Sequence, residues 1–318
     1  MLGIAWGASI GGVGTIIGTP PNGIALGILQ STLGGAHGAG SISFVSWMAI
    51  GIPFVVLFLP MAWMVLLMVF PPEVQRIEGG RELLQAEYRA LGPMSAGERG
   101  TVTLLGLAVL AWFLLPFREQ MLPEMLARQL AWLDEYTIGL LAGVGLFLVP
   151  VDLRGGKFVL TWEDTHYVEW GILLLFGGGI ALSHALFVTG LASWLASSFV
   201  ALFGAPSQAV MVATVVVLVD GLTEVTSNTA VVSMVVPVLI SIAKETGQSP
   251  TALAVAAAMA SSMAFMLPVA TPPNALAYTS GYVRIRDMIR AGIVLDVLGA
   301  FMVVLTTLLL GSFLLALF

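Results

Sequence analysis

Long apolar stretches separated by short polar connections make up most of the chain. They cover residues 44–70, 101–116, 137–150, 170–203 and 292–317. A helix needs about 20 predominantly apolar residues to cross the hydrocarbon core of a bilayer, so we expect each stretch to be a membrane span, two of them short ones. Trp47 and Trp63 lie toward the two ends of the first stretch, as residues that anchor a span at the interface often do. The pattern predicts an all-α polytopic membrane protein.

Polar connections join the spans. The three long ones are residues 71–100, 117–136 and 151–168. We expect the first to be a loop with some helical character and the second to be amphipathic. The stretch 170–203 is too long for one straight span, and we expect Gly177–Gly179 to be either an interruption of the helix or a close-packing point. Its second part, Ser183–Leu202, is expected to lie in the membrane interface as an amphipathic connector.

A polar segment interrupts the apolar pattern in the last third of the chain. Gly221–Ala230 carries hydroxyl, amide and carboxyl side chains between two apolar arms, Val210–Val219 and Val231–Ile242. Polar groups without partners are costly in hydrocarbon, so non-helical backbone persists there only where protein buries it or where it lines a wet cavity. Each arm is about half as long as a span. We therefore predict a re-entrant hairpin whose polar tip is a binding site.

One four-residue motif occurs twice and predicts two broken helices. Thr19-Pro20-Pro21-Asn22 recurs 252 positions later as Thr271-Pro272-Pro273-Asn274. Consecutive prolines break a helix and free backbone groups. We expect the preceding helices to run to Ile17 and Val269 and to break at the motif. A helix break repeated at matching positions indicates the binding site of a transporter.

The spans between the two motifs give the copies opposite orientations. Four crossings separate them and the hairpin adds none, so the first broken helix runs outward and the second inward, as in an inverted-repeat transporter. Placing residues 71–100, 151–168 and 284–290 in the cytoplasm puts nine of the twelve Lys and Arg residues inside, as the positive-inside rule favours.

The composition excludes a soluble protein. Hydrophobic residues make up 58% of the chain and charged residues 9%, with a mean hydropathy of +1.00, whereas soluble domains carry about 25% charged residues. Residues 1–72, 170–219 and 246–283 contain no Asp, Glu, Lys or Arg. The absence of cysteine excludes disulfides and fits a bacterial inner (plasma) membrane. The net charge of −6 gives no indication of a nucleic-acid partner.

The predicted breaks and hairpin tip offer groups for both a cation and an anion. Carbonyl, hydroxyl and amide oxygens suit a hard monovalent cation, whereas N–H groups and helix N-termini suit a carboxylate or sulfate. Neither the hairpin nor the second broken helix contains Lys or Arg. An anion bound there would need co-bound cations as its counter-charge, which predicts sodium-coupled import.

Three segments carry a resemblance to a known family, namely Ser9–Asn22, Thr223–Thr229 and Leu267–Tyr282. They resemble the divalent anion:sodium symporters, which include bacterial dicarboxylate and mammalian citrate and sulfate transporters. The resemblance covers nearly the whole chain but only the later part of a typical member. It implies an elevator-type symporter, embedded in lipid and active as a homodimer, that moves di- or tricarboxylates such as succinate or malate together with Na⁺ ions.

The resemblance also implies which residues bind. One sodium ion would be held, partly through backbone carbonyls, by Thr223, Thr226, Asn228 and Ala270. The substrate would meet Ser227, Asn228, Thr229, Thr271 and Pro272. Gly18 would belong to the other sodium site, with the substrate-binding residues Thr19 and Pro20 beside it.

In these terms the chain divides into four parts. Residues 1–70 would end a first repeat in the transport domain, and 71–100 would be a cytoplasmic loop. Residues 101–205 would form scaffold and dimerisation helices with the interfacial connector, and 206–318 the second-repeat transport domain.

Simpler structural explanations exist for each feature. Ser227–Thr229 can satisfy its own turn, and each Thr-Pro-Pro-Asn motif can be an ordinary proline kink. Asp220 and Glu224 are spaced to share one helix face, where they either ligate sodium or, by their proximity, leave one of the pair protonated. We expect Asp296 to make a helix-packing contact. The histidines are expected in loops or at the interface, at His37, His166 and His184.

Other functions compete with sodium symport. A sodium-independent dicarboxylate exchanger and a sulfate transporter would keep the same fold. A membrane-embedded hydrolase would use Ser227 as its nucleophile, but no His or Lys lies near it in sequence to activate it. We therefore expect a transporter and no enzyme.

The 252-residue offset generates a test at the level of the gene. Applied to Ser227–Thr229, it points about 25 residues upstream of Met1. We expect this chain to be the C-terminal part of a longer protein, with Met1 an internal methionine, a misassigned start or an artificial boundary. Reading the upstream codons should reveal a second Ser-Asn-Thr hairpin, and their failure to encode one would refute the expectation.

Overall fold

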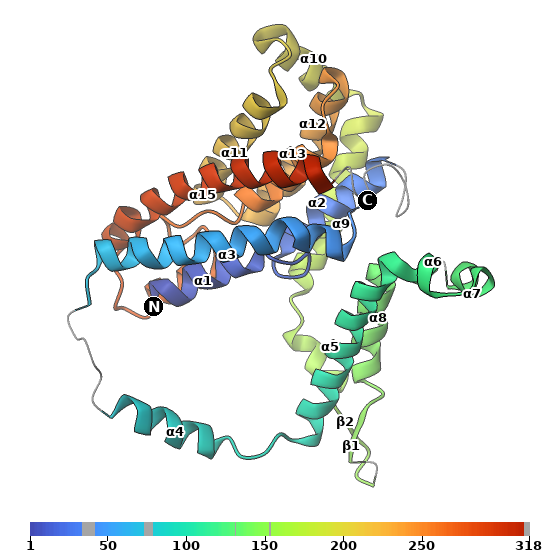
Figure 1. The fold of residues 1–318 in the computed structure, drawn as a ribbon, viewed down its shortest axis with the longest axis vertical. Helices are drawn as coiled ribbons and strands as arrows, with labels where there is room; N and C mark the ends of the chain where they lie inside the picture. Colours follow the sequence, from blue (N-terminus) through green and yellow to red (C-terminus); the bar gives the residue numbers. More distant parts are fainter. Residues whose placement is uncertain (34–41, 73–78, 131, 153, 315–318) are drawn as a thin grey trace. The chain divides into compact units, whose positions relative to one another are not determined.

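The computed structural model describes residues 1–33, 42–72, 79–130, 132–152 and 154–314. Its elements are almost all helices (Figure 1). In order they are α1 (Leu2–Gly12), α2 (Pro20–Leu33), α3 (Phe44–Val69), α4 (Gly80–Ala90), α5 (Ala96–Leu114), α6 (Arg118–Met121), α7 (Glu124–Gln129), α8 (Glu135–Leu146), α9 (Trp170–Val188), α10 (Leu191–Phe203), α11 (Gln208–Val225), α12 (Asn228–Thr246), α13 (Pro250–Ala260), α14 (Pro272–Thr279) and α15 (Ile285–Leu314). One two-stranded sheet pairs β1 (Pro150–Asp152) with β2 (Lys157–Phe158). His37 lies outside the described residues.

The membrane character predicted from sequence is confirmed. Six helical segments of the described chain are long and apolar enough to cross a membrane: α3, α5 with its continuation to Met121, α9, α11, α12 and α15. The hairpin arms are longer than expected, because α11 has 18 residues and α12 has 19. Ser207 caps α11 by accepting a hydrogen bond from the Val210 N–H, which starts the helix earlier than the apolar pattern alone indicated.

Two compact units make up the chain, and the smaller comprises residues 43–45 and 72–169. In it α5 packs against α8, and the Trp112 indole N–H donates to the Glu135 carbonyl oxygen at 2.9 Å. A capping box between Ser95 and Glu98 begins α5. The helical character expected in residues 71–100 is present as α4. Residues 117–136 hold the short helices α6 and α7.

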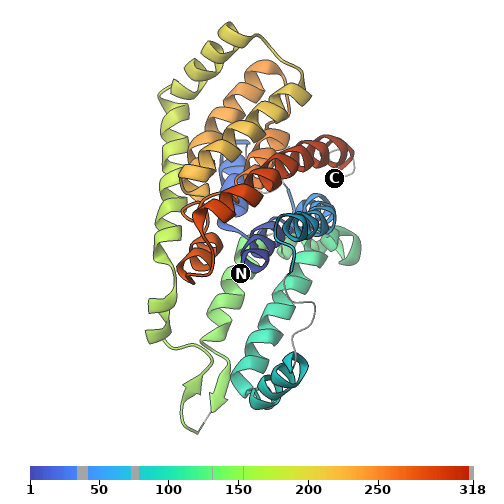
Figure 2. The same ribbon diagram turned by 90° about the vertical axis from the view of Figure 1, so that its left-hand side faces the viewer.

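The larger unit comprises residues 1–42, 46–71 and 170–318. Its centre is α13, whose residues from Thr251 to Ala260 are all buried and mostly alanine. Small side chains allow the close helix packing that membrane proteins use. Around α13 lie α2, α11, α12 and α15, while α9 and α10 pack along the outside of α12 (Figure 2). Helices α9 and α10 therefore belong to the larger compact unit, while the assignment of residues 101–205 to a scaffold stays a prediction.

Of the two alternatives expected for the triple glycine, the helix break is wrong and the close-packing point is confirmed. Helix α9 continues through Gly177–Gly179 to Val188, and the break falls at Thr189 and Gly190, where Gly190 has φ +76°. Gly179 instead marks a close contact with α12. A Cβ atom added to Gly179 would lie 2.8 Å from Ser233 Oγ, whereas Gly177 and Gly178 face open space. Of the three glycines, only Gly179 is therefore required by packing.

This contact predicts opposite effects for two neighbouring substitutions. Gly179→Ala should lower the free energy of unfolding by about 1–3 kcal/mol, because the new methyl group overlaps Ser233, which donates to the Thr229 carbonyl oxygen. Gly178→Ala should be neutral or stabilising by up to about 1 kcal/mol, since alanine favours helix. Thermal unfolding of both purified variants in detergent measures the difference. Equal midpoints would contradict the close packing of α9 on α12.

Candidate functional site

Both predicted broken helices are present, but each breaks earlier than expected. Helix α1 ends at Gly12 and α13 at Ala260, while the prolines of each motif occupy the first turn of α2 and α14. A proline is tolerated in the first turn because the N–H it lacks would have no partner there, and its fixed φ suits a helix. The non-helical segments are therefore Val13–Thr19 and Ser261–Thr271. The motif ends each break and does not begin it.

One asparagine in each motif holds its break together. The Asn22 side-chain N–H₂ donates to the carbonyl oxygens of Gly12 and Thr15, at 3.1 and 2.9 Å. That of Asn274 donates to Ala264 and Leu267, both at 3.1 Å. Every acceptor pair repeats at the 252-residue offset, so the internal repeat extends to individual hydrogen bonds. Both asparagines belong to the repeated motif, but the sequence gives no sign of these hydrogen bonds.

A long helix approaches each break closely through a glycine. A Cβ on Gly51 of α3 would lie 2.6 Å from the Val13 carbonyl oxygen, and one on Gly292 of α15 would lie 2.7 Å from the Phe265 backbone. One turn from each glycine, a polar side chain binds the same break. Trp47 donates its indole N–H to the Val13 carbonyl oxygen at 2.9 Å. Trp47 is therefore a buried part of the site rather than the expected interface anchor, while Trp63 is exposed.

The counterpart of Trp47 at the second break is a carboxylate. Asp296 on α15 accepts a hydrogen bond from the Phe265 N–H at 3.0 Å, so it binds backbone rather than making the expected helix-packing contact. Glu224 on α11 accepts from the N–H groups of Met266 and Leu267, each at 3.0 Å. These bonds tie the end of the first hairpin arm to the second break. Glu224 thus accepts from two consecutive backbone N–H groups, one on each of its carboxylate oxygens.

The hairpin tip consists of two residues in extended conformation between α11 and α12. Thr226 ends α11 and Ser227 precedes α12. The Thr223 hydroxyl donates to the Asp220 carbonyl oxygen, and the Thr226 hydroxyl to that of Leu222. Each hydroxyl has thereby used its only proton and presents lone pairs, which is the arrangement a cation ligand requires.

Asn228 adds a second indication of a cation ligand. Its Oδ1 atom is buried and accepts no hydrogen bond from the described residues. A buried acceptor without a donor calls for an explanation such as an ion or a water molecule. Oxygen ligands of this kind, with no thiolate or imidazole among them, fit a hard cation such as sodium. No group of three His, Asp or Glu residues in the described chain could hold a metal ion.

The remaining predicted residues lie around the two breaks. Ala270 is buried, and buried Thr271 accepts the Asn274 N–H on its hydroxyl oxygen at 3.3 Å, which caps α14. Pro272 and Ser227 are exposed, and Thr229 is half-buried. At the first break, Gly18 and Pro20 are exposed and Thr19 is half-buried. The structure thus joins the hairpin tip to the second break through Glu224, while the roles of the individual ligands stay predictions.

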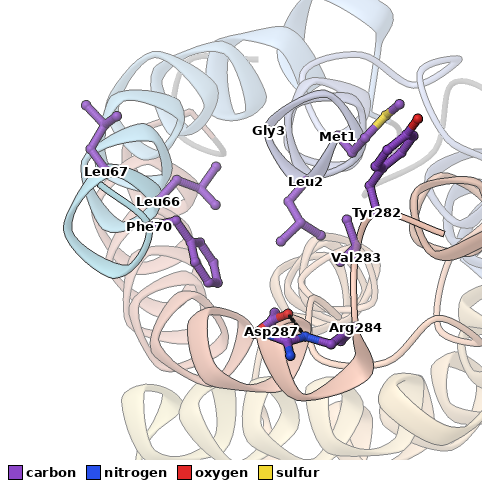
Figure 3. Close-up of a pocket in the computed structure, with 10 residues that line it drawn as sticks. All are labelled: Met1, Leu2, Gly3, Leu66, Leu67, Phe70, Tyr282, Val283, Arg284 and Asp287. Carbon is purple, nitrogen blue, oxygen red and sulfur yellow. Dashed lines mark hydrogen bonds and ion pairs between the residues drawn. The ribbon is translucent and has the colours of Figure 1, made fainter. Parts of the chain in front are cut away.

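A separate cavity of about 450 Å³ lies at the start of α1 (Figure 3). The C-terminal end of α3, the loop before α15 and the first turn of α15 complete the cavity, and its lining is mostly apolar. Arg284 and Asp287 are its charged residues, and they are paired with each other at 2.9 Å. Because this pair leaves neither charge free, the cavity is a poorer candidate for an anion than the two helix breaks.

Comparison with known proteins identifies similar chains. Residues 1–317 match the sodium:sulfate symporter transmembrane region. The chain is 35% identical over 310 residues to the sodium-dependent dicarboxylate transporter SdcS of Staphylococcus saprophyticus, and 35% identical over 307 residues to that of Staphylococcus aureus. Both alignments cover 96% of this chain and 57% of the relative. The chain therefore spans little more than half the length of these relatives.

The paired asparagines give a stability prediction. Asn22→Asp and Asn274→Asp each remove two N–H donors and put a carboxyl group against two carbonyl oxygens. Each should lower the free energy of unfolding by roughly 2–5 kcal/mol, measured by thermal unfolding in detergent. Gln208→Glu makes the same chemical change on an exposed residue in the first turn of α11, where a negative charge is favourable, and should be neutral. If the asparagine variants matched this control, the asparagines would not hold the breaks.

Proposed function

Because this chain belongs to the sodium:sulfate symporter family, we propose that it forms part of a sodium-coupled symporter of di- or tricarboxylates such as succinate or malate. The observation that carries the proposal is the tie between Glu224 and the backbone of Met266 and Leu267. It brings a hairpin tip rich in hydroxyl and amide oxygens to the non-helical segment Ser261–Thr271, and neither part contains Lys or Arg.

Sodium would bind where these oxygens converge. Its ligands would be the lone pairs of Thr223 and Thr226, the unpartnered Oδ1 of Asn228 and the Ala270 carbonyl oxygen. The other sodium ion would use the first break at Gly18. Hard cations prefer such oxygen ligands, and each ion would supply positive charge that the side chains of this region lack.

The substrate carboxylates would bind between the start of α12 and the start of α14. The first N–H groups of a helix have no partner within it, so Asn228, Thr229 and Ala230 can donate to an anion. Helix α14 begins with Pro272 and Pro273, which carry no N–H, so it contributes mainly its dipole and the Thr271 hydroxyl. Ser227, Thr19 and Pro20 would complete the substrate site.

The wider mechanism follows the family resemblance. We expect inverted repeats, an elevator movement of the repeat helices against a scaffold, a homodimer and a bacterial inner-membrane location. The large unit of residues 1–42, 46–71 and 170–318 contains both breaks and the hairpin, so it is the candidate for the moving part. Sulfate transport and sodium-independent exchange are the alternatives on the same fold. The family and its relatives are transporters, so the chain is not an enzyme and a hydrolase using Ser227 has no support.

Sodium coupling predicts a simple uptake result. Proteoliposomes containing the full-length protein should accumulate labelled succinate in sodium buffer and lose that uptake when choline replaces sodium. Parallel assays with labelled citrate and sulfate identify the preferred anion. Uptake that persists in choline would favour the exchanger, and uptake of sulfate alone would replace the carboxylate assignment.

The proposed ligands predict a second result. Asn228→Ala should reduce sodium-driven uptake at least about tenfold, because it removes an oxygen ligand of sodium and a contact to the substrate. Gln248→Ala is the matched control, since it removes an amide that binds the Pro206 carbonyl oxygen at the far end of α12. Comparable uptake by both variants, at equal protein content, would exclude Asn228 from the site.

A further inference from the structure

The second helix break contains three consecutive backbone N–H groups that all point to carboxylates. The Phe265 N–H donates to Asp296, and those of Met266 and Leu267 donate to Glu224. Phe265 is fully buried and both acids are 4% exposed. An unpaired N–H in such surroundings costs free energy, and a helix would have supplied the missing acceptors. The two carboxylates therefore replace the helix as partners of this segment.

Neither carboxylate forms an ion pair with a Lys or Arg of the described residues. On the elements packed against Glu224, the other titratable groups are Asp220 on α11 and Arg286, Asp287, Arg290 and Asp296 on α15, while α13 and residues 261–271 carry none. Lys244 and Glu245 lie at the far end of α12. The second oxygen of Asp296 meets no N–H or O–H donor among the described residues, and it faces the Glu224 carboxyl. The backbone amides are thus the main partners of both acids.

The hydrogen bonds from Glu224 and Asp296 to the segment Phe265–Leu267 form a clamp. This clamp connects the two halves of the sodium site proposed above. Glu224 follows Thr223 directly and precedes Thr226 by two residues, while Leu267 precedes Ala270 by three. A displacement of the segment Phe265–Leu267 would therefore move the Ala270 carbonyl relative to the threonine hydroxyls. The distance between these ligands decides whether one ion can be bound by all of them.

The first break has no such clamp within this chain. Trp47 binds the Val13 carbonyl oxygen there, and the position 252 residues before Asp296 is Phe44. The asparagine that holds each break is common to both copies, whereas Asp296 has no acidic counterpart at Phe44. The role of Asp296 therefore concerns the second break and is not a general requirement of the broken helix.

We propose that Glu224 and Asp296 are positioning residues that hold the segment Phe265–Leu267 against the hairpin tip and thereby set the affinity of the Ala270 sodium site. This inference rests on the proposed sodium coupling. The two acids act on the cation through the backbone they bind and do not contact it.

Four variants separate this role from others. Glu224→Gln leaves one accepting oxygen where two N–H groups need partners. Asp296→Asn keeps an acceptor for the Phe265 N–H and places an N–H toward Glu224, whereas Asp296→Leu removes the acceptor at similar volume. Glu245→Gln is the control, because it makes the same change on exposed α12 surface, where Glu245 accepts from the Ser197 hydroxyl.

The absence of cysteine allows a reporter that does not depend on transport. Val269 is 68% exposed in the loop just before Ala270, so Val269→Cys adds a single thiol there. In the full-length protein, with any cysteine of its remaining part replaced by serine, the rate at which a water-soluble thiol reagent modifies this cysteine should fall as sodium is added. The sodium concentration giving half-maximal protection reports the affinity of the site at its loop.

The expected order of the variants is specific. Glu224→Gln and Asp296→Leu should raise the half-protecting sodium concentration at least about tenfold, because each leaves one N–H of the segment Phe265–Leu267 without an acceptor. Asp296→Asn and Glu245→Gln should stay within about twofold of the parent. A merely structural role would lower the yield or the melting temperature of the protein without this ordering of sodium affinity.

Each contrary outcome has a distinct meaning. If the Val269→Cys parent shows sodium-driven uptake and protection but Glu224→Gln is unchanged, the clamp does not set sodium affinity and the inference is overturned. If Asp296→Asn is as impaired as Asp296→Leu, the charge and not the hydrogen bond to the loop matters, which also overturns it. If the parent itself responds to sodium in neither assay, the proposed function fails first. Should Glu224→Gln not fold, the pair of Asp296 variants decides the question.

Discussion

The constraint on which the structure depends is the need of buried backbone for hydrogen-bond partners where no water is available. Two helices in this chain stop in the interior, and each leaves a segment of seven to eleven residues without helical bonds. Side chains from distant positions supply the partners: an asparagine at both breaks, an indole at one and two carboxylates at the other. In the proposed function the same deficit would also provide carbonyl oxygens for ions, so that stabilising the fold and forming the site would be one problem.

The shape of the interior follows from how closely these partners must approach. Gly51 and Gly292 bring α3 and α15 against the two breaks, and Gly179 brings α9 against α12. A side chain at Gly51 would hold α3 too far away for Trp47 to reach the Val13 carbonyl, and one at Gly292 would keep Asp296 from the Phe265 amide. Small residues therefore do more than permit packing here, because they determine which polar groups can meet.

Much of this arrangement was predictable from sequence, and the failures have local causes. The apolar pattern predicted α3, α5, α9 and α15 as spans, and the repeated Thr-Pro-Pro-Asn motif located both breaks. The apolar pattern was wrong for residues 137–150, where α8 is too short, and for α11 and α12, which are long enough to cross although half-length arms were expected. The motif was assigned to the wrong side of each break, because a proline pair can either end a helix or begin one, and the choice depends on which neighbours pair with the freed backbone. Asp296 and Trp47 were misjudged for a related reason. Their partners lie 31 and 34 residues away, and no periodicity records such contacts.

The proline pair at the start of α14 has a consequence for selectivity. A helix end with free N–H groups holds an anion by directed hydrogen bonds and so discriminates between anions of different shape. At α14 the prolines leave the electric field of the helix but remove those directed contacts. A site formed partly by such a field would select its substrate by charge more than by shape. Anions as different as a tetrahedral oxyanion and a four-carbon diacid can then be accommodated by relatives that share one architecture.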